Sequence, residues 1–449
     1  MKNIPVLLLN FNRPDLTRGL IENLKVIQPL KVYVAIDGPR ENNTEDAVNC
    51  ALVEKAIELI DWNCEIKLSK NKKNIGLRRN VKMNIDWFFS ENEIGIVLED
   101  DIRFGEDFFK YTYSVLANYR QDERIGVVSG NNMVGHLTDC PKTGNHAFLC
   151  SIFHCWGWAT WRERWQLYDD NIEHDDDFFV NKLPGILCNS QALNFWNSVR
   201  QGMLDGRVNS WAWRMQFSLW RAGKLCVTPP KNLTINVGFS SEATHTASKP
   251  RWLDGWGIEI INDINITPRR LSLASTFDKF ENQVILGVQI NKSLDIGCGA
   301  TPKNFFGADL VYGIDVRDDL ENHIKRADLV IEPIPYEDDF FEYVTAHDFL
   351  EHIPRLLYAP DRRYPFVELM NEIYRVLKMG GIFLSFTPAY PHGEAFRDPT
   401  HVNIISEQTF FAYFDDVNRW ASMYGFKGSF KIVSQEWRGP HLLTLMRKV

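Results

Sequence analysis

Residues 293–299 read Ser-Leu-Asp-Ile-Gly-Cys-Gly, a short apolar strand that runs directly into a turn of small residues. Gly297 and Gly299 carry no side chain, so the backbone of this turn can approach a ligand closely. Asp315 ends the next apolar stretch, twenty residues after Asp295, which is the position of the acid that binds ribose hydroxyls in nucleotide-binding α/β folds. The stretch therefore predicts an α/β unit with a ribose-containing ligand at the carboxyl ends of its strands.

The residue at position 302 distinguishes between two kinds of ribose-containing ligand. A dinucleotide site requires a third glycine there, and this chain has Pro302. Because no pyrophosphate has to fit, S-adenosylmethionine is favoured over NAD. Only fifteen residues separate Gly299 from Asp315, so any helix between the first two strands is expected to be short.

Three later segments extend this pattern: Ile-Pro-Tyr-Glu-Asp-Asp-Phe at 334–340, Val-Thr-Ala-His-Asp-Phe-Leu-Glu-His-Ile at 344–353, and Glu-Ile-Tyr-Arg-Val-Leu-Lys-Met-Gly-Gly at 372–381. With the glycine turn, they resemble class I S-adenosylmethionine-dependent methyltransferases over residues 290–449. The resemblance implies a Rossmann-like sheet. It also implies four residues that bind S-adenosylmethionine, namely Asp295, Gly297, Gly299 and Asp315.

Two histidines are candidates for the proton transfer that methylation of a hydroxyl requires. An imidazole titrates near neutral pH and is suited to this step. His352 follows the predicted fourth strand, and His401 lies in the insertion after the fifth. The alternative for both is a structural role, with the ring hydrogen-bonded to the backbone.

The first hundred residues show a second alternation of strands and helices. Apolar strands are expected at 4–10, 31–36, 64–68 and 94–98, with helical patterns between them. Such alternation is typical of a parallel α/β sheet, in which ligands bind at the carboxyl ends of the strands. The polar residues that follow each strand are therefore the first candidates for a site.

Acidic residues follow two of these strands. Glu99, Asp100 and Asp101 come together after the fourth strand, where a divalent cation with oxygen ligands would remove their mutual repulsion and bridge the phosphates of a nucleotide diphosphate. Asp37 ends the second strand, where it could accept hydrogen bonds from a nucleobase. A solvated acidic turn is the alternative for the triplet.

The ordered motifs Asn-Phe-Asn-Arg-Pro (10–14), Ala-Ile-Asp-Gly-Pro-Arg (35–40), Asn-Ile-Gly-Leu-Arg-Arg-Asn (74–80) and Val-Leu-Glu-Asp-Asp (97–101) resemble GT-A glycosyltransferases. Within that class they are similar to the N-acetylglucosaminyltransferase I branch and its bacterial relatives, over residues 4–250. The resemblance implies a nucleotide-sugar donor, most simply a UDP-sugar, and a Mn²⁺ or Mg²⁺ ion. It implies donor contacts from Asp37, Gly76, Arg79 and Asp100, metal ligands Asp101 and His245, and acceptor contacts from Trp156, Trp158, Trp161 and Trp211.

The proton acceptor for sugar transfer is missing from its expected place. In the N-acetylglucosaminyltransferase I branch an acid lies between two tryptophans, whereas this chain has Ala212 between Trp211 and Trp213. Asp205 and Glu163 are nearby substitutes in sequence. The gap leaves a second hypothesis open, in which the first half is a non-catalytic glycan-binding module that presents substrate to a methyltransferase.

The sequence thus predicts two α/β domains, a GT-A domain at 1–285 and a methyltransferase domain at 286–449. Together they form a bifunctional enzyme of surface glycan or polysaccharide synthesis, with a glycan or glycolipid acceptor. With 50 basic and 58 acidic residues and no basic run, nucleic acid is not expected as a partner. No stretch has the length of a membrane span, so a cytoplasmic protein is expected, with any membrane association made through the acceptor.

Overall fold

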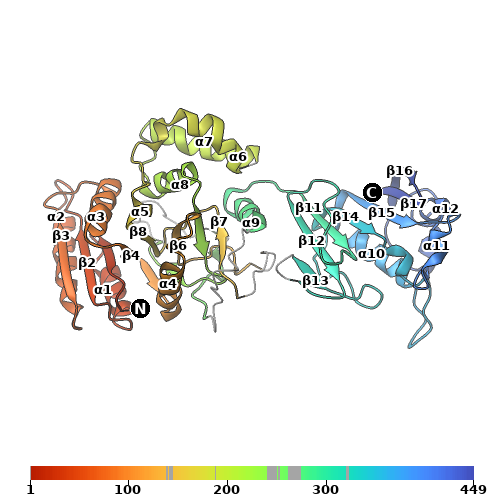
Figure 1. Cartoon of the computed structure of the whole chain (residues 1–449), viewed down its shortest axis with the longest axis horizontal. Coiled ribbons are helices and arrows are strands. Elements are labelled where there is room, and N and C mark those ends of the chain that lie inside the picture. The colour runs from red at the N-terminus through yellow and green to blue at the C-terminus, as the bar shows by residue number, and fades with distance from the viewer. Residues whose placement is uncertain are drawn as a thin grey trace. The chain divides into compact units, whose positions relative to one another are not determined.

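The computed structural model describes residues 2–137, 140, 145–187, 189–239, 250, 253–260, 275–319 and 323–449, and all statements below refer to these. The chain divides into two compact units, Met1–Val288 and Gln289–Val449 (Figure 1). Helix α9 (Ser275–Leu286) belongs to the first unit, so the division lies slightly beyond the 285/286 boundary expected from the sequence. No described helix combines the length and the apolar character needed to cross a bilayer.

The first unit is built on an eight-stranded mixed sheet with the order β3-β2-β1-β4-β8-β6-β9-β7. The strands are β1 (Val6–Asn10), β2 (Lys31–Ile36), β3 (Glu65–Lys70), β4 (Ile94–Glu99), β6 (Ile125–Ser129), β7 (Phe148–Cys150), β8 (Trp158–Trp161) and β9 (Leu225–Thr228). The first four are parallel to one another, β8 is antiparallel to β4 and β6, and β7 is antiparallel to β9. Two further strands, β5 (Ile102–Phe104) and β10 (Thr234–Asn236), form a separate antiparallel pair.

The strand order reverses between β1 and β4, since β2 and β3 lie on one side of β1 and β4 on the other. Every residue of β1 is buried, as expected for an apolar strand covered on both faces. Polar residues follow both β1 and β4. Because the strand order reverses between them, the connections that leave their carboxyl ends move apart. This point is where a parallel α/β sheet forms its ligand crevice.

Helices cover this sheet and build a second core. They are α1 (Pro14–Leu24), α2 (Thr44–Ala56), α3 (Leu77–Glu91), α4 (Glu106–Asn118), α5 (Arg162–Trp165), α6 (Leu183–Leu187), α7 (Ser190–Leu204) and α8 (Trp211–Arg221). Helices α6, α7 and α8 pack on one another (Figure 1) and enclose an apolar cluster that includes Phe178, Trp196 and Phe217. Part of the high aromatic content of the chain is therefore core.

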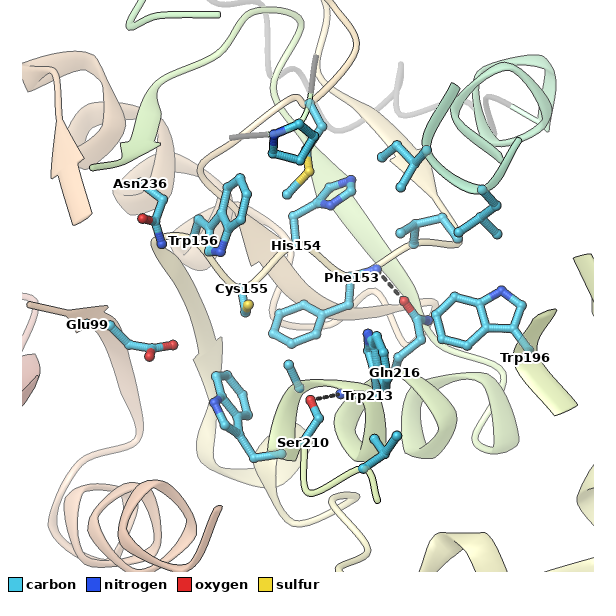
Figure 2. A pocket seen from close by; sticks show the side chains of 18 of the residues that line it. Glu99, Phe153, His154, Cys155, Trp156, Trp196, Ser210, Trp213, Gln216 and Asn236 are labelled. Carbon is cyan, nitrogen blue, oxygen red and sulfur yellow. Dashed lines mark hydrogen bonds between the residues drawn. The ribbon is translucent and has the colours of Figure 1, made fainter. Parts of the chain in front are cut away.

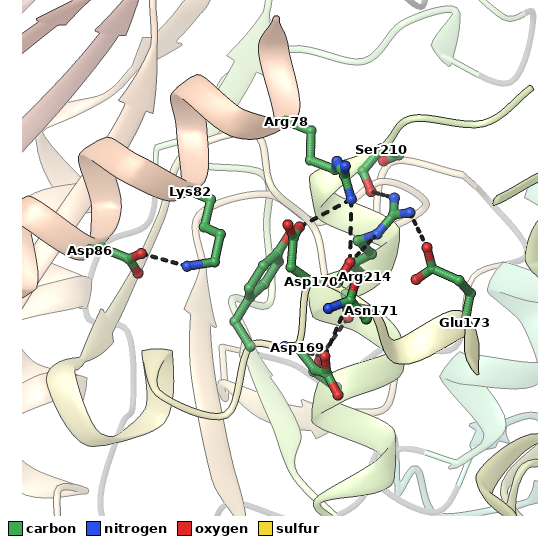
Figure 3. A network of polar contacts seen from close by, with 11 residues as sticks. Arg78, Lys82, Asp86, Asp169, Asp170, Asn171, Glu173, Ser210 and Arg214 are labelled. Carbon is green, nitrogen blue, oxygen red and sulfur yellow. Dashed lines mark hydrogen bonds and ion pairs between the residues drawn. The ribbon is translucent and has the colours of Figure 1, made fainter. Parts of the chain in front are cut away.

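The buried side chain of Arg214 connects α8 to residues 170–173 (Figure 3). Arg214 pairs with the Glu173 carboxylate, and both side chains are almost fully buried. Its Nε and Nη1 donate to the carbonyl oxygens of Asp170, at 3.0 Å, and of Ser210, at 3.1 Å. Arg78 on α3 donates to the same Asp170 carbonyl at 3.3 Å. The network fixes the amino end of α8, which carries Trp211.

The second unit contains a seven-stranded sheet with the order β13-β12-β11-β14-β15-β17-β16. The strands are β11 (Lys292–Ile296), β12 (Leu310–Asp315), β13 (Ile324–Arg326), β14 (Phe341–His347), β15 (Leu377–Pro388), β16 (Phe430–Arg438) and β17 (His441–Lys448). Its first five strands are parallel in the order 3-2-1-4-5 of a nucleotide-binding fold, and β17 is antiparallel to both β15 and β16. The predicted α/β class is confirmed.

Turns, rather than the short helix expected from the sequence, fill residues 297–309 between β11 and β12. The Asp295 carboxylate holds this connection, since its Oδ2 accepts from Lys303 N at 2.9 Å and its Oδ1 from Thr345 Oγ1 at 2.7 Å. Helix α10 (Pro365–Val376) packs on β15. The short helices α11 (Glu394–Arg397) and α12 (Glu407–Tyr413) follow β15.

The buried ion pair generates a stability prediction. Arg214→Ala should lower the free energy of unfolding of the first unit by about 3–5 kcal/mol, because it leaves the Glu173 charge buried without a partner. Urea unfolding followed by tryptophan fluorescence measures the change. Arg207→Ala is the matched control, since Arg207 pairs with Asp205 at the surface, where solvent screening leaves an ion pair with little effect on stability. Equal effects of the two variants would contradict the prediction.

Candidate functional sites

Three carboxylates stand at the carboxyl end of β4. Glu99 is its last residue, and Asp100 and Asp101, which follow, are both buried. Arg13, just after β1, forms a two-pronged ion pair with Asp100, and its Nη1 lies 3.0 Å from Oδ2 of Asp101. Strands β1 and β4 are neighbours, so this ion pair lies at the position in the sheet where the strand order reverses.

The cluster holds more acid than base. Burial, together with the charges of Asp101 and Asp100, raises the pKa of Glu99 to about 8. Burial also raises the pKa of Asp100 to about 7, against the opposing charge of Arg13. The charges of two guanidiniums, Arg13 and Arg103, act on three carboxylates, so a divalent cation with oxygen ligands fits the site electrostatically. Arg13 engages both oxygens of Asp100 but only Oδ2 of Asp101, so Glu99 and Asp101 are the more available ligands.

A cavity of about 580 Å³ opens beside this cluster. Arg13 and Asp101 contribute to its lining, as does Glu99 (Figure 2). Six aromatic residues contribute to the remaining walls: Phe153, Trp156, Phe195, Trp196, Trp211 and Trp213. Apolar walls with a few charged groups are typical of small-molecule sites of this size.

A histidine and a glutamate also line this cavity, and sequence reasoning missed both. His154 and Glu281 are 3% and 1% exposed, and Nε2 of the imidazole lies 2.8 Å from Oε1 of the carboxylate. Neither oxygen of Glu281 accepts a hydrogen bond from the residues that the structure describes. The only sequence signal was the three-residue spacing of Asp278 and Glu281 on α9. Asp278 accepts from Ser151 N, and burial raises the pKa of Asp278 to about 7.

The predicted acceptor tryptophans divide into two pairs. Trp156 and Trp211 line the cavity. Trp158 and Trp161 are 1% exposed on β8, and Nε1 of Trp161 donates to the Leu116 carbonyl. Trp158 stacks behind Trp211 with ring centroids 5.8 Å apart. Trp158 can therefore affect the cavity through Trp211, whereas Trp161 belongs to the sheet core.

The predicted donor contacts come from different elements: Asp37 follows β2, Gly76 precedes α3, Arg79 lies in the first turn of α3, and Asp100 follows β4. Asp37 is buried, and its Oδ1 accepts from Gly38 N, Asn71 Nδ2 and Ile75 N at 2.9–3.1 Å. This carboxylate orders the loop before α3, which leaves only its second oxygen for a ligand. Gly76 has φ 85°, a backbone conformation that favours glycine, and Arg79 is exposed.

The two proposed replacement bases lie outside the cavity lining. Asp205 follows α7 and pairs with Arg207, and Glu163 lies 3.6 Å from Arg120. His245 lies outside the described residues.

The two glycines of the turn after β11 in the second unit have different roles. Gly297 has φ 67°, and a Cβ there would lie 2.2 Å from Cδ2 of Phe349, so the fold itself requires glycine. Gly299 has φ 64° and faces open space, and its N–H donates to Oδ2 of Asp315 at 3.1 Å. Asp295 is buried beneath the turn, where it holds the backbone.

His352 and His401 come together at the same edge of the second sheet. His352 ends a short 3-10 helix (Leu350–His352) that follows β14, and His401 lies in the connection that follows β15. Their ring centroids are 4.9 Å apart, and the Glu351 carboxylate adjoins both. Both histidines are half-buried, whereas Glu351 is buried.

Residues 294–385 match the family model described as "Methyltransferase domain". The second unit therefore contains a segment that is similar to this methyltransferase family. Similar solved structures include a SAM-dependent methyltransferase from Archaeoglobus fulgidus, with 15% identity over 35% of this chain and 86% of that one and a TM-score of 0.25. A putative methyltransferase from Bacillus halodurans has 19% identity over 38% and 98%, with a TM-score of 0.23. No curated protein matches the sequence.

The two turn glycines generate a paired prediction. Each has a positive φ, so an alanine at either position carries the same backbone cost of about 1–2 kcal/mol. Gly297→Ala should lower the stability of the second unit by a further 1–3 kcal/mol or so, because its methyl group overlaps Phe349. Gly299→Ala should instead weaken S-adenosylmethionine binding. Chemical unfolding and calorimetry measure the two effects, and equal unfolding free energies would contradict the distinction.

Proposed function

We propose that this chain is a bifunctional enzyme that transfers a sugar from a nucleotide-sugar donor and methylates a sugar hydroxyl. The match of residues 294–385 to a methyltransferase family supports the second activity. The first activity rests on one observation, the aromatic cavity that borders Glu99, Asp101 and Arg13 at the strand reversal between β1 and β4. That position is the ligand crevice of a parallel α/β sheet.

The methyl donor is proposed to lie against the turn after β11. Gly299 leaves space for its backbone approach, and the carboxylate of Asp315 would accept the ribose hydroxyls. Transfer moves the methyl group from the sulfonium to a sugar oxygen, and the electron pair of the broken C–S bond stays on sulfur. The hydroxyl proton must also leave, and His352 and His401 lie at the sheet edge where it would do so.

The sugar donor is proposed to lie in the first cavity, with its diphosphate toward Glu99 and Asp101. A divalent cation held by these two carboxylates would supply charge neutralisation for the departing diphosphate. Arg79 is exposed in the first turn of α3, whose Leu77 lines the cavity, and suits a phosphate contact. Trp156 and Trp211 offer flat faces on which the apolar side of an acceptor sugar can stack.

His154 and Glu281 are proposed to remove the proton of the acceptor hydroxyl. They supply the acid–base pair that is absent at Ala212, and they line the same cavity as that residue. The carboxylate would orient the imidazole and stabilise its protonated form, which is the usual division of roles in such pairs. This assignment favours a catalytic first unit over the alternative of a glycan-binding module.

Joining the two activities in one chain has a physical advantage. A tethered second site meets the product of the first at high effective concentration. A methyl group on a sugar hydroxyl also removes that oxygen as a later acceptor. Both effects suit the assembly of a surface glycan or polysaccharide.

Asp101 generates a prediction that separates the two activities. Asp101→Ala should abolish sugar transfer and leave methyl transfer intact, because it removes a cation ligand from the first unit alone. Mass spectrometry of products formed from a panel of nucleotide sugars with S-adenosylmethionine measures both. Asp205→Ala and Glu163→Ala should retain sugar transfer, since neither lines the cavity. Full sugar transfer by Asp101→Ala would overturn the cation assignment.

Glu281 tests the choice between a transferase and a glycan-binding module. Glu281→Gln keeps the shape of the side chain and should reduce the turnover number for sugar transfer at least about 100-fold, as expected for loss of an acid–base group. Nucleotide binding should be unchanged. A wild-type protein that binds glycans but transfers no sugar from any donor would favour the module.

Asp315 generates the corresponding prediction for the methyl donor. Asp315→Ala should weaken S-adenosylmethionine by on the order of 1.5–3 kcal/mol for each lost hydrogen bond to the charged acceptor. Isothermal titration calorimetry of the full chain measures this affinity. Arg317→Ala is the control, because Arg317 is largely exposed and contacts the same carboxylate from outside. An unchanged affinity in Asp315→Ala would mean that the ribose binds elsewhere.

A further inference from the structure

Glu351, His352 and His401 form a compact group at the edge of the second sheet. Each offers one atom that can ligate a metal ion, and these atoms lie within 4.8 Å of one another. The three residues come from the two connections that follow β14 and β15, which are adjacent parallel strands. Two imidazoles and one carboxylate are a ligand set that binds divalent transition metals such as Zn²⁺, Co²⁺ and Fe²⁺.

Two atoms of these side chains that could ligate a metal are buried without a hydrogen bond among the described residues. Glu351 is 1% exposed, and its Oε2 accepts from Thr387 Oγ1 at 2.7 Å, whereas its Oε1 has no partner among the described residues. Nδ1 of His401 is likewise buried and has no partner there. An unsatisfied buried acceptor costs about 1–3 kcal/mol, and more if it is charged. A cation between the two side chains would satisfy both atoms.

The third member, His352, is oriented as a metal ligand would be. Its Nδ1 lies 3.0 Å from Thr400 Oγ1 and 3.3 Å from the Thr400 carbonyl oxygen. The Thr400 hydroxyl donates to Asp398 at 2.6 Å, so it accepts from His352. Nδ1 therefore carries the ring proton, and Nε2 keeps its lone pair. Metal-binding histidines are commonly held by such a bond from the other ring nitrogen.

Backbone hydrogen bonds hold the two connections together independently of any ion. The Glu351 carbonyl oxygen accepts from Val402 N and Asn403 N, both at 2.9 Å. The Asn403 side chain donates to the Leu350 carbonyl at 3.0 Å and accepts from Arg355 Nε at 2.6 Å. The ligands are thus brought together by the fold, and bonds of about 2.0–2.2 Å require only a small further approach.

We propose that Glu351, His352 and His401 bind a divalent transition-metal ion beside the methyl-donor site. Phe349, two residues before Glu351, packs on Gly297 of the donor turn, so the two features are contiguous. Both histidines are half-buried, which leaves the outer side of the ion open to a further oxygen ligand.

The role of the ion rests on the proposed methyl transfer. A sugar hydroxyl bound at its open position would have a lowered pKa and would release its proton to water. The oxygen then forms the new bond to the methyl carbon, and the sulfur keeps the electrons of the broken C–S bond. His352 and His401 act as ligands in this scheme and need not take the proton themselves.

The test is a Co²⁺ titration of the full-length, tag-free protein, followed by visible absorption. It is done in an Asp101→Ala background, which removes the cation ligand proposed for the first unit. We expect one equivalent of Co²⁺ with ligand-field bands, and displacement by Zn²⁺. His401→Ala and His352→Ala should each weaken Co²⁺ at least about tenfold. Glu351→Gln should do the same while keeping the shape of the buried side chain.

His392→Ala is the matched control, because His392 is an exposed histidine on the same connection after β15 and lies outside the cluster. It should bind Co²⁺ as the background protein does. Calorimetry with S-adenosylmethionine verifies that each variant is folded. Co²⁺ binding unchanged in both His352→Ala and His401→Ala, with S-adenosylmethionine bound normally, would overturn the site. Because no acceptor is used, this outcome is distinct from a failure of methyl transfer.

Discussion

Three carboxylates can stand at the end of buried strand β4 because Arg13 lies between two of them. The guanidinium pairs with Asp100 and Asp101. Arg13 follows β1, the neighbour of β4, so the order of the strands brings the compensating charge to these carboxylates. Burial still raises the pKa of Glu99, which has no such partner. The residual excess of acid, at the mouth of an aromatic cavity, is the physical basis for assigning a cation and a diphosphate to this end of the sheet.

The aromatic residues serve two purposes in the first unit. Trp161 and Trp196 contribute to its two cores, and Trp196 also reaches the cavity wall. Trp211 faces the cavity because the Arg214 network fixes the amino end of α8. The cavity is therefore a continuation of the core, and its shape depends on a buried ion pair that makes no contact with the proposed ligands.

In the second unit, the turn proposed to bind the methyl donor contacts the proposed acceptor side because Gly297 has no side chain. Gly297 admits Phe349, and Phe349 sets the position of the short helix that carries Glu351 and His352. A larger residue at 297 would thus disturb the acceptor side as well as the turn. In both units the functional groups lie at the carboxyl ends of adjacent parallel strands, where connections from different parts of the chain meet.

Strands β6, β7, β8 and β9 of the first sheet were not predicted from the sequence. The sequence by itself determined the α/β class, the first four strands of the first sheet to within a few residues, and the Glu99–Asp101 and Gly297–Gly299 stretches as candidate sites. These are local properties, because apolar runs and small-residue turns are visible in consecutive residues. It offered Asp205 and Glu163 as substitute bases, and the structure places both outside the cavity lining. Only the tertiary structure brought Glu281 to His154, across more than a hundred residues, and Glu351 to His401. Such pairs depend on which connections meet at a sheet edge, and that is decided by strand order and long-range packing.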